Sequence, residues 1–416
     1  MLCLVDGNNF FVSCERVFNP KLEGKPVAVL SNNDGCCISR SNEFKALGIK
    51  MGTPYFQLKK DEKRLGLIML SSNYALYGDM SRRLIAVLEE FSPNVEQYSI
   101  DEAFLEVPNS ESDFLAFGKK LRQTLLRYLG IPCGVGIAPT KTLCKIANHL
   151  AKKSKEGVLV LPADCQEILK ATPIEEVWGI GRALAPKVQA LGILSAYDLA
   201  KHDLSLIRKH FGLFTQRTAL ELRGTPCIED EPEETKPKSI SHSRTFGVKV
   251  TSLDELKESV ASYLSSCAVK LRQSGQVAAG ALVYFRSQFS WEDYKFGTKS
   301  IEVIFPRPTD STSSMLNAIV PRLKEIYDKN LRYRKSGVVL FGLEDKAAPS
   351  QRDLFQNDGA KKEVSKLFAT VDAINKKFGK GTLGVLAEGT QKRWSMKRDH
   401  LSRCYTTDWK ELLEVK

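Results

Sequence analysis

Three acidic residues stand where β-strands are expected to begin or end. Asp6 closes the apolar run "LCLV", and Asp101 and Glu102 follow a β-prone run in "YSIDEAF". Adjacent carboxylates repel, and burial raises the pKa of each unless a cation compensates their charge. Mg2+ suits such a site because it takes hard oxygen ligands and keeps positions for substrate phosphates.

If the two strands lie side by side, Asp6 and Asp101 can bridge two metal ions. One ion then activates an attacking hydroxyl and the other neutralises a leaving phosphate, which is the chemistry of phosphoryl transfer. The alternative is structural: Asp6 caps the helix that follows, and Asp101 and Glu102 lie in an exposed turn. For either element alone this alternative weighs at least as much, and the combination of the two weakens it.

The elements that must position these acids alternate between strands and helices up to residue 161. This pattern predicts an α+β fold, with a sheet packed on one face by helices. Residues 162–227 read as short helices broken by Gly and Pro, and a charged, proline-bearing linker follows. Strands and helices return at 240–344 as a second α/β domain.

Composition favours a large soluble protein with a polyanionic partner. The chain has 416 residues, 43% of them hydrophobic, so about two to four domains are expected. Its formal net charge of +12 favours nucleic acid, because a basic surface releases counterions from phosphates. A basic surface without a specific role is the alternative, and charge alone does not decide between them.

Cysteines and hydropathy point to the cytoplasm. The ten cysteines are scattered and the chain has only five histidines, so neither a disulfide framework nor a zinc site is indicated, and reduced thiols are expected. Asp6 interrupts the first apolar run too early for a signal peptide. No apolar run approaches the roughly 18 residues needed to span a bilayer.

Four segments carry a resemblance to a known family. "VDGNNFFVSCE", "SNNDGCCISRSNEFKALGIKMG", "SSNYALYGDMS" and "YSIDEAFLEV" closely resemble the Y-family DNA polymerases, and among them the UmuC-type subunits. The resemblance implies a multidomain right-hand polymerase with a palm, small fingers, a helical thumb and an α/β little finger. The predicted boundaries are 1–11 with 74–161 for the palm, 12–73 for the fingers, 162–228 for the thumb, 229–239 for the linker, 240–344 for the little finger and 345–416 for the tail.

The resemblance implies roles for the acids. Asp6, Asp101 and Glu102 would be the catalytic carboxylates that bind two Mg2+ ions, and the backbone carbonyl of Gly7 would add a ligand. Phe11, next to Phe10 in the nucleotide site, matches the steric gate that excludes a ribose 2′-hydroxyl. Many relatives have Tyr there, and Phe keeps the bulk, so selection of the sugar is expected to survive.

Further nucleotide contacts follow from the same resemblance. Lys152 matches a lysine that contacts the triphosphate, whose negative charge needs compensation. Asn42 and Lys45 occupy positions where many relatives carry Tyr and Arg. Lysine supplies a point charge in place of a bidentate fork, so a changed contact geometry is expected. A single lysine in so basic a chain is more often a solvated surface residue.

A glycine-bearing turn predicts contact with the DNA backbone. In "WGIGRALAPKVQALGI", Gly179 and Gly181 flank Ile180 ahead of residues with helical periodicity. Such a turn presents backbone N–H groups to a phosphate, and it resembles a helix-hairpin-helix element. The alternative is a turn between paired helices that binds nothing.

Two tail segments resemble sites for protein partners. In "APSQRDLFQND", Gln351, Leu354 and Phe355 match the spacing of peptides that bind the sliding clamp, although folding back onto the little finger would also explain them. The closing basic and aromatic region resembles the tail that binds a processed UmuD-type accessory subunit. A RecA filament is the remaining partner implied.

The sequence therefore predicts an error-prone, DNA-directed DNA polymerase that performs translesion synthesis on damaged primer-template DNA in the SOS response, using deoxynucleoside triphosphates. One alternative is a non-catalytic DNA-binding scaffold that keeps the fold, which loss of a metal carboxylate would favour; all three are present. Another two-metal enzyme, such as a nuclease, leaves Phe11 and the thumb-like segment unexplained.

Overall fold

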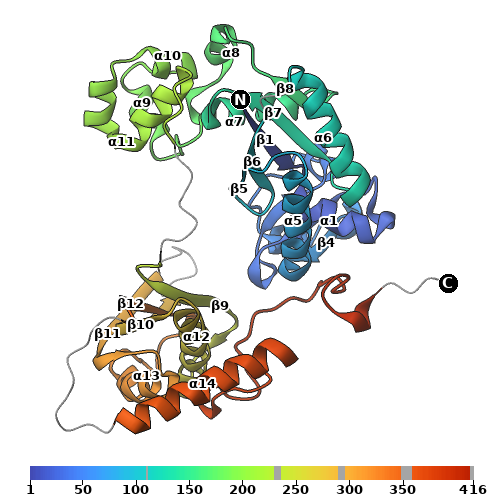
Figure 1. Ribbon diagram of the computed structural model, residues 1–416. Coiled ribbons are helices and arrows are strands. Elements are labelled where there is room, and N and C mark those ends of the chain that lie inside the picture. The colour runs from blue at the N-terminus through green and yellow to red at the C-terminus, as the bar shows by residue number, and fades with distance from the viewer. Residues whose placement is uncertain (109–110, 229–235, 289–295, 348–357, 413–416) are drawn as a thin grey trace. The chain divides into compact units, whose positions relative to one another are not determined.

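The computed structural model describes residues 1–108, 111–228, 236–288, 296–347 and 358–412. The chain divides into two compact units, one of residues 1–231 with 399–416 and one of residues 232–398 (Figure 1). Each unit has its own core and is described by itself. All ten cysteines are unpaired, as the sequence predicts.

A five-stranded sheet in the order β5-β6-β1-β7-β8 forms the centre of the first unit. Strand β1 pairs antiparallel with both β6 and β7, and β8 adds in parallel to β7. The first strand of the chain is therefore in the middle of the sheet. The strands are β1 (Leu2–Gly7), β5 (Val95–Gln97), β6 (Glu102–Glu106), β7 (Cys133–Ala138) and β8 (Val158–Val160).

The two faces of this sheet are covered by different helices. Cys3 and Val5 point to a core formed with α1 (Phe10–Phe18), α5 (Tyr74–Glu89) and α6 (Phe114–Leu129). Leu4, in contrast, packs with α7 (Lys141–Ala151). The prediction of helices on one face was wrong, because apolar side chains alternate along β1 to both faces and each face needs cover.

Helix α7 lies unusually close to strand β7. A Cβ atom on Gly136 would lie 2.3 Å from the backbone nitrogen of Asn148 and 2.6 Å from the carbonyl oxygen of Cys144. Helix α7 is capped by Thr140, whose hydroxyl accepts from the N–H of Leu143. Glycine at 136 thus sets the distance between α7 and the sheet.

An insertion between α1 and α5 forms a second, three-stranded sheet in the order β3-β2-β4. Strands β2 and β4 are parallel, and β3 is antiparallel to β2. A small core around Phe44 and Leu30 holds it together. Its elements are η1 (Pro20–Leu22), β2 (Val27–Leu30), η2 (Asn32–Asp34), β3 (Cys37–Arg40), α2 (Asn42–Ala46), α3 (Tyr55–Leu58), α4 (Glu62–Leu65) and β4 (Ile68–Ser71).

Short helices follow the central sheet and share a core with α7. Buried Glu221 on α11 fastens them, because its carboxylate accepts from the N–H and hydroxyl of Thr142 at 2.8 and 2.9 Å. The helices are α8 (Gln166–Ala171), η3 (Ile174–Glu176), α9 (Ala185–Gln189), α10 (Ala196–Lys201) and α11 (Leu204–Leu222).

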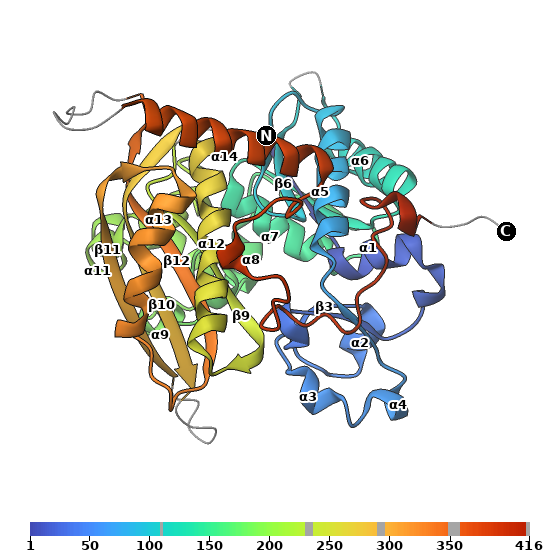
Figure 2. The same cartoon turned by 90° about the horizontal axis from the view of Figure 1, so that it is seen from below.

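The second unit is an antiparallel sheet in the order β11-β10-β12-β9. Helices α12 and α13 lie side by side on one face of it (Figure 2), and Trp394 enters the same core. Its elements are β9 (Ile240–Val250), α12 (Leu253–Gln273), β10 (Gln276–Gln288), β11 (Phe296–Thr309), α13 (Thr312–Ile319), η4 (Val320–Glu325), β12 (Tyr333–Asp345), α14 (Asp358–Phe378) and η5 (Leu386–Glu388).

The last described residues return to the first unit. From Asp399 the chain runs along the three-stranded sheet and helices α1 and α5, and ends in η6 (Trp409–Glu411) (Figure 2). The segment predicted as a single tail from 345 is thus divided between the two units.

Candidate active site

Two of the predicted carboxylates face each other across neighbouring strands. Asp6 on β1 is the direct partner of Glu102 on β6 in the antiparallel register. Both lie on the α7 face of the sheet, because Leu4 and Phe104, two positions away on their strands, belong to the core under that helix. Strand pairing alone therefore brings residues 96 positions apart to one edge of the sheet.

Asp101 lies in the turn just before β6. Its backbone carbonyl accepts from the N–H of Gly7 at 2.9 Å, and its carboxylate accepts from the hydroxyl of Ser99 at 2.6 Å. A Cβ atom on Gly7 would lie 2.9 Å from the ring of Phe10. The glycine therefore lets the Asp101 turn, the end of β1 and the start of α1 meet in one place.

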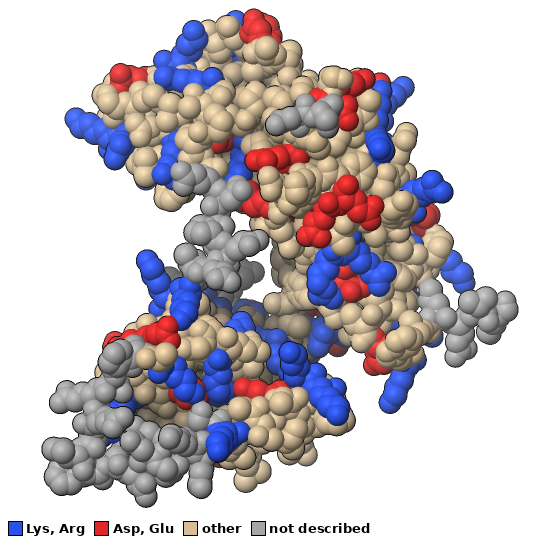
Figure 3. Space-filling view, in the orientation of Figure 1, with Lys and Arg blue, Asp and Glu red and all other residues tan. Residues whose placement is uncertain are grey.

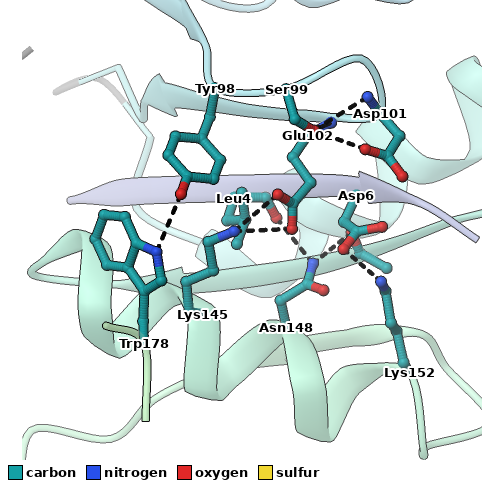
Figure 4. Close-up of polar contacts among 11 residues, drawn as sticks. Leu4, Asp6, Tyr98, Ser99, Asp101, Glu102, Lys145, Asn148, Lys152 and Trp178 are labelled. Atoms are coloured by element: carbon teal, nitrogen blue, oxygen red, sulfur yellow. Dashed lines mark hydrogen bonds and ion pairs between the residues drawn. The ribbon is translucent and has the colours of Figure 1, made fainter. Parts of the chain in front are cut away.

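Two lysines from α7 and its C-terminus neutralise these acids (Figure 4). The Lys145 ammonium donates to both carboxylate oxygens of Glu102 at 2.8 Å. The Lys152 ammonium lies 2.5 Å from Asp6 Oδ2. Asn148 between them donates to the carbonyl oxygens of Leu4 and Gly134 and ties the helix to the sheet.

The electrostatics of Asp6 are those of an incompletely compensated acid. Burial raises the pKa of Asp6 to about 7, Lys152 opposes this rise, and the nearby Glu102 carboxylate adds to it. An anion on Asp6 thus needs more positive charge than Lys152 supplies.

The donor set suits a hard divalent cation. As the side chains lie, no group of three or more His, Cys, Asp or Glu residues converges as metal ligands within the described ranges. Asp6 and Glu102 are opposed in register with Asp101 adjoining, however, and their oxygens are the ligands that Mg2+ prefers. The raised pKa of Asp6 indicates where a cation would be stabilised, so the residues fit the predicted metal.

Lys145 is a residue of the site that the sequence analysis missed. Its ammonium lies 4.3 Å from the centre of the Tyr98 ring, and Trp178 donates from its indole N–H to the Tyr98 hydroxyl at 3.1 Å. A helical projection would have found Lys145, since Lys141, Lys145, Asn148 and Lys152 follow one another at spacings of four and three residues.

The predicted steric gate lies in an aromatic cluster. The Phe11 ring stacks on Tyr77 with centroids 4.4 Å apart and planes inclined by 11°, and Tyr74 approaches its edge. Phe10 is buried and packs beside Phe11, so it supports the cluster from the core. The ring of Phe11 is thereby held in one orientation.

The remaining predicted nucleotide contacts lie on the inserted sheet. Lys45 on α2 has a lowered pKa, first because it is partly buried and then because Arg40 and Lys152 repel its charge, while Asp6 opposes the shift. Lys45 therefore lies within electrostatic reach of Lys152 and Asp6. Asn42 accepts from the side-chain amide of Asn9 at 3.1 Å.

The predicted DNA-binding turn packs against the helical core on one side. Gly179 has a φ of 88°, which favours glycine, and Ile180 is buried in the helical core. A Cβ atom on Gly181 would meet nothing within 4 Å, and its carbonyl accepts from the N–H groups of Leu184 and Ala185. The turn is anchored on one side and open on the other, and DNA contact stays a prediction.

The predicted clamp-binding residues Gln351, Leu354 and Phe355 lie outside the described residues.

On the face shown in Figure 3, acidic side chains gather over the middle of the first unit, whereas basic side chains predominate on the second unit. In the described part of the chain, no helix combines the length and apolarity that crossing a membrane requires.

Comparison with known proteins identifies the family of the chain. The impB/mucB/samB family matches residues 5–149, an IMS family HHH motif matches 162–193, and the C-terminal domain of the impB/mucB/samB family matches 237–354. A domain of unknown function, DUF4113, matches 365–415. The protein UmuC of Salmonella typhimurium is 42% identical over the whole of both chains. The chain belongs to the UmuC-type Y-family DNA polymerases.

Other relatives and a solved structure extend the comparison. ImpB of Salmonella typhimurium is 39% identical over 99% of both chains, and DNA polymerase IV of Oceanobacillus iheyensis is 30% identical over 95% of both. A Y-family polymerase chimera of Dbh and Dpo4 superposes with a TM-score of 0.64 at 25% identity, covering 82% of this chain and 98% of the chimera. This Y-family polymerase therefore has the predicted right-hand fold and is a DNA-directed DNA polymerase of the translesion class, in a family that uses divalent metal ions.

Proposed function

We propose that this polymerase extends primers across damaged template positions in the SOS response, with Asp6, Asp101 and Glu102 as its catalytic carboxylates. The observation that carries the proposal is the pairing of Asp6 with Glu102 across β1 and β6, with the Asp101 carbonyl bound to the N–H of Gly7. Asp6 and the adjacent pair Asp101 and Glu102, distant in sequence, are thereby brought together where β1 ends and β6 begins.

These acids and the Gly7 carbonyl would hold two Mg2+ ions. When bound, the ions would activate the primer 3′-hydroxyl for attack on the α-phosphate and would compensate the charge on the leaving pyrophosphate. The chain's own contribution is position and charge. Lys145 holds Glu102 in place, while Lys152 and Lys45 would present ammonium groups to the triphosphate.

The aromatic cluster around Phe11 would select the sugar. Stacked on Tyr77, the Phe11 ring occupies a fixed position in which it excludes a 2′-hydroxyl by bulk, and Phe10 packs behind it. Asn42, joined to Asn9 ahead of α1, adds a polar contact to the nucleotide from the inserted sheet. A ring without a phenol oxygen suffices for this role because the exclusion is steric.

The remaining contacts are assigned by position in the fold. The Gly179–Ile180–Gly181 turn would bind the duplex backbone without reading sequence. The predicted boundaries assign the central sheet to the palm, the insertion to the fingers, the following helices to the thumb and the second unit to the little finger. Sliding clamp, processed UmuD-type subunit and RecA filament are the proposed protein partners, in the cytoplasm.

Primer extension past an abasic template site tests the proposal. The purified chain is assayed with Mg2+ and deoxynucleoside triphosphates, with and without clamp, UmuD-type subunit and RecA. Asp101→Ala should abolish extension, whereas Glu106→Ala should not, because Glu106 is an exposed acid at the opposite end of strand β6. This matched variant separates loss of the metal site from loss of a charge on the strand.

The results distinguish the enzyme from a scaffold. Extension that survives Asp101→Ala would remove the acids from the mechanism. If wild type and variant bind DNA equally and neither extends a primer under any condition, the chain acts as a DNA-binding scaffold that keeps the polymerase fold.

A further inference from the structure

The C-terminal segment 399–412 is built into the polymerase body. Its first residues lie against the inserted sheet: the N–H of Asp399 donates to the Asp34 carboxylate at 2.9 Å, and His400 exchanges hydrogen bonds with Ser71 at the end of β4. The His400 ring meets Tyr55 edge-on at 5.6 Å. These contacts combine backbone and side-chain bonds, so they fix the path of the segment.

The segment then reaches the two helices that carry the aromatic cluster. The side-chain amide of Asn73, the N-cap of α5, donates to the Ser402 hydroxyl at 2.9 Å and to the Arg403 carbonyl at 3.0 Å. Farther on, the Tyr405 ring stacks on Phe18 at the end of α1, with centroids 5.0 Å apart. The segment thus bridges α1 and α5 as well as the inserted sheet.

A buried acid joins the segment to the sugar-selecting cluster. Glu15 on α1 is 1% exposed, and its Oε1 accepts from the Ser402 hydroxyl at 2.9 Å and from the Tyr77 hydroxyl at 2.7 Å. The Tyr77 ring is the one that stacks on Phe11. Glu15 and Phe11 are four residues apart on α1, so Tyr77 contacts both from one side of the helix.

Burying the Glu15 carboxylate costs free energy unless hydrogen-bond donors offset the loss of water. Burial raises the pKa of Glu15, and the hydrogen bonds from Tyr77 and Ser402 counteract that rise. A buried acid without these donors would lose much of its stabilisation. An apolar residue at 15 would pack the same core, but it would leave the Tyr77 hydroxyl without its acceptor and the tail without its anchor on α1.

We propose that Glu15 is a positioning residue for sugar selection, and that Ser402 of the C-terminal segment completes its hydrogen-bonded set. Ser402 and Tyr77 hold the Glu15 carboxylate, Glu15 in turn fixes the Tyr77 hydroxyl, and the Tyr77 ring fixes the plane of Phe11. Residues 399–412 lie within the stretch that matches a domain of unknown function. Through Ser402 this segment therefore contributes to the position of Phe11 in the nucleotide site. The inference rests on the proposed role of Phe11.

The test is the ratio of kcat/KM for a deoxynucleoside triphosphate to that for the matching ribonucleoside triphosphate, measured with the full chain on an undamaged primer-template. Tyr77→Phe keeps the ring and removes the hydroxyl, and Ser402→Ala removes the donor from the tail. Each should lower the ratio about tenfold because ribonucleotide incorporation rises. Glu15→Leu should do the same, and Glu15→Gln should restore most of the ratio because its amide oxygen still accepts both bonds.

Two further variants separate the possible failures. Thr407→Ala removes an exposed hydroxyl from the same segment and should leave the ratio unchanged. Phe11→Ala tests the proposed steric gate: if it leaves the ratio unchanged, the gate itself is wrong. The positioning role of Glu15 is overturned if Phe11→Ala collapses the ratio but Tyr77→Phe and Ser402→Ala leave it intact. A ratio left intact includes the case in which these two variants lower kcat/KM for both nucleotides by the same factor.

Discussion

Replacing Gly136 by alanine should impair nucleotide incorporation by displacing a helix, without touching any side chain of the site. The new Cβ would lie 2.3 Å from the Asn148 backbone nitrogen, so α7 must move by about 1 Å to restore an ordinary contact. Lys145 and Lys152 move with the helix, away from Glu102 and Asp6. A misplacement of about 1 Å costs on the order of 100-fold in rate.

The same change should also lower stability. Forcing a methyl group against backbone atoms costs about 1–3 kcal/mol, which thermal unfolding measures. Single-nucleotide incorporation gives kcat/KM under conditions in which the variant is fully folded. We expect a loss of about 100-fold in kcat/KM, together with the modest loss of stability.

Gly118→Ala is the matched control. Its Cβ would lie 2.6 Å from a methyl group of Val158, so it overpacks the opposite face of the same sheet, under α6. It should cost comparable stability and leave α7 in place. If both variants lose activity by the same factor, or if Gly136→Ala is destabilised but incorporates nucleotides normally, the position of α7 does not control the site and the reasoning is refuted.

Three further predictions concern stability. Glu221→Ala should lower the free energy of unfolding by about 3 kcal/mol, because buried donors lose a charged acceptor; chemical denaturation measures this. Burial lowers the pKa of His242 to about 4, so the folded state stays neutral while the unfolded chain binds a proton, and stability should fall as pH drops from about 6.5 to 4. His242→Phe should flatten that slope in thermal unfolding. Trp394→Ala should cost about 3–5 kcal/mol, whereas Trp409→Ala, at an 89% exposed position, should leave the unfolding midpoint unchanged.

Local pattern was enough to find the acids and the strands that carry them. Asp6 ends an apolar run, and Asp101 and Glu102 come directly before the next one. That Asp6 opposes Glu102 rather than Asp101 was not predictable, because a shift of one residue in the pairing exchanges them. Lys145 was missed although its spacing from Lys152 and Asn148 places all three on one side of a helix.

The contacts that hold the Phe11 ring through Tyr77, Glu15 and Ser402 could not be predicted from any local sequence pattern. Ser402 lies 387 positions from Glu15, in a short polar segment without periodicity. One signal was present in the sequence, since Glu15 falls on the apolar side of a helix that begins "FFVSCERVF". An acid in that place indicates a buried partner, but only the folded chain identifies it as Tyr77 and Ser402.

Among its described residues, the stretch that matches a domain of unknown function has no hydrophobic core of its own. Trp394 is buried in the core of the second unit, and Asp372 on α14 forms a bidentate ion pair with Arg272 on α12. Ser402 and Tyr405, by contrast, contact the first unit. Because Trp394 packs in the core of the second unit while Ser402 and Tyr405 pack against the first, the fold of this stretch depends on the polymerase units. Substitutions in this stretch should therefore change nucleotide selection and the stability of both units.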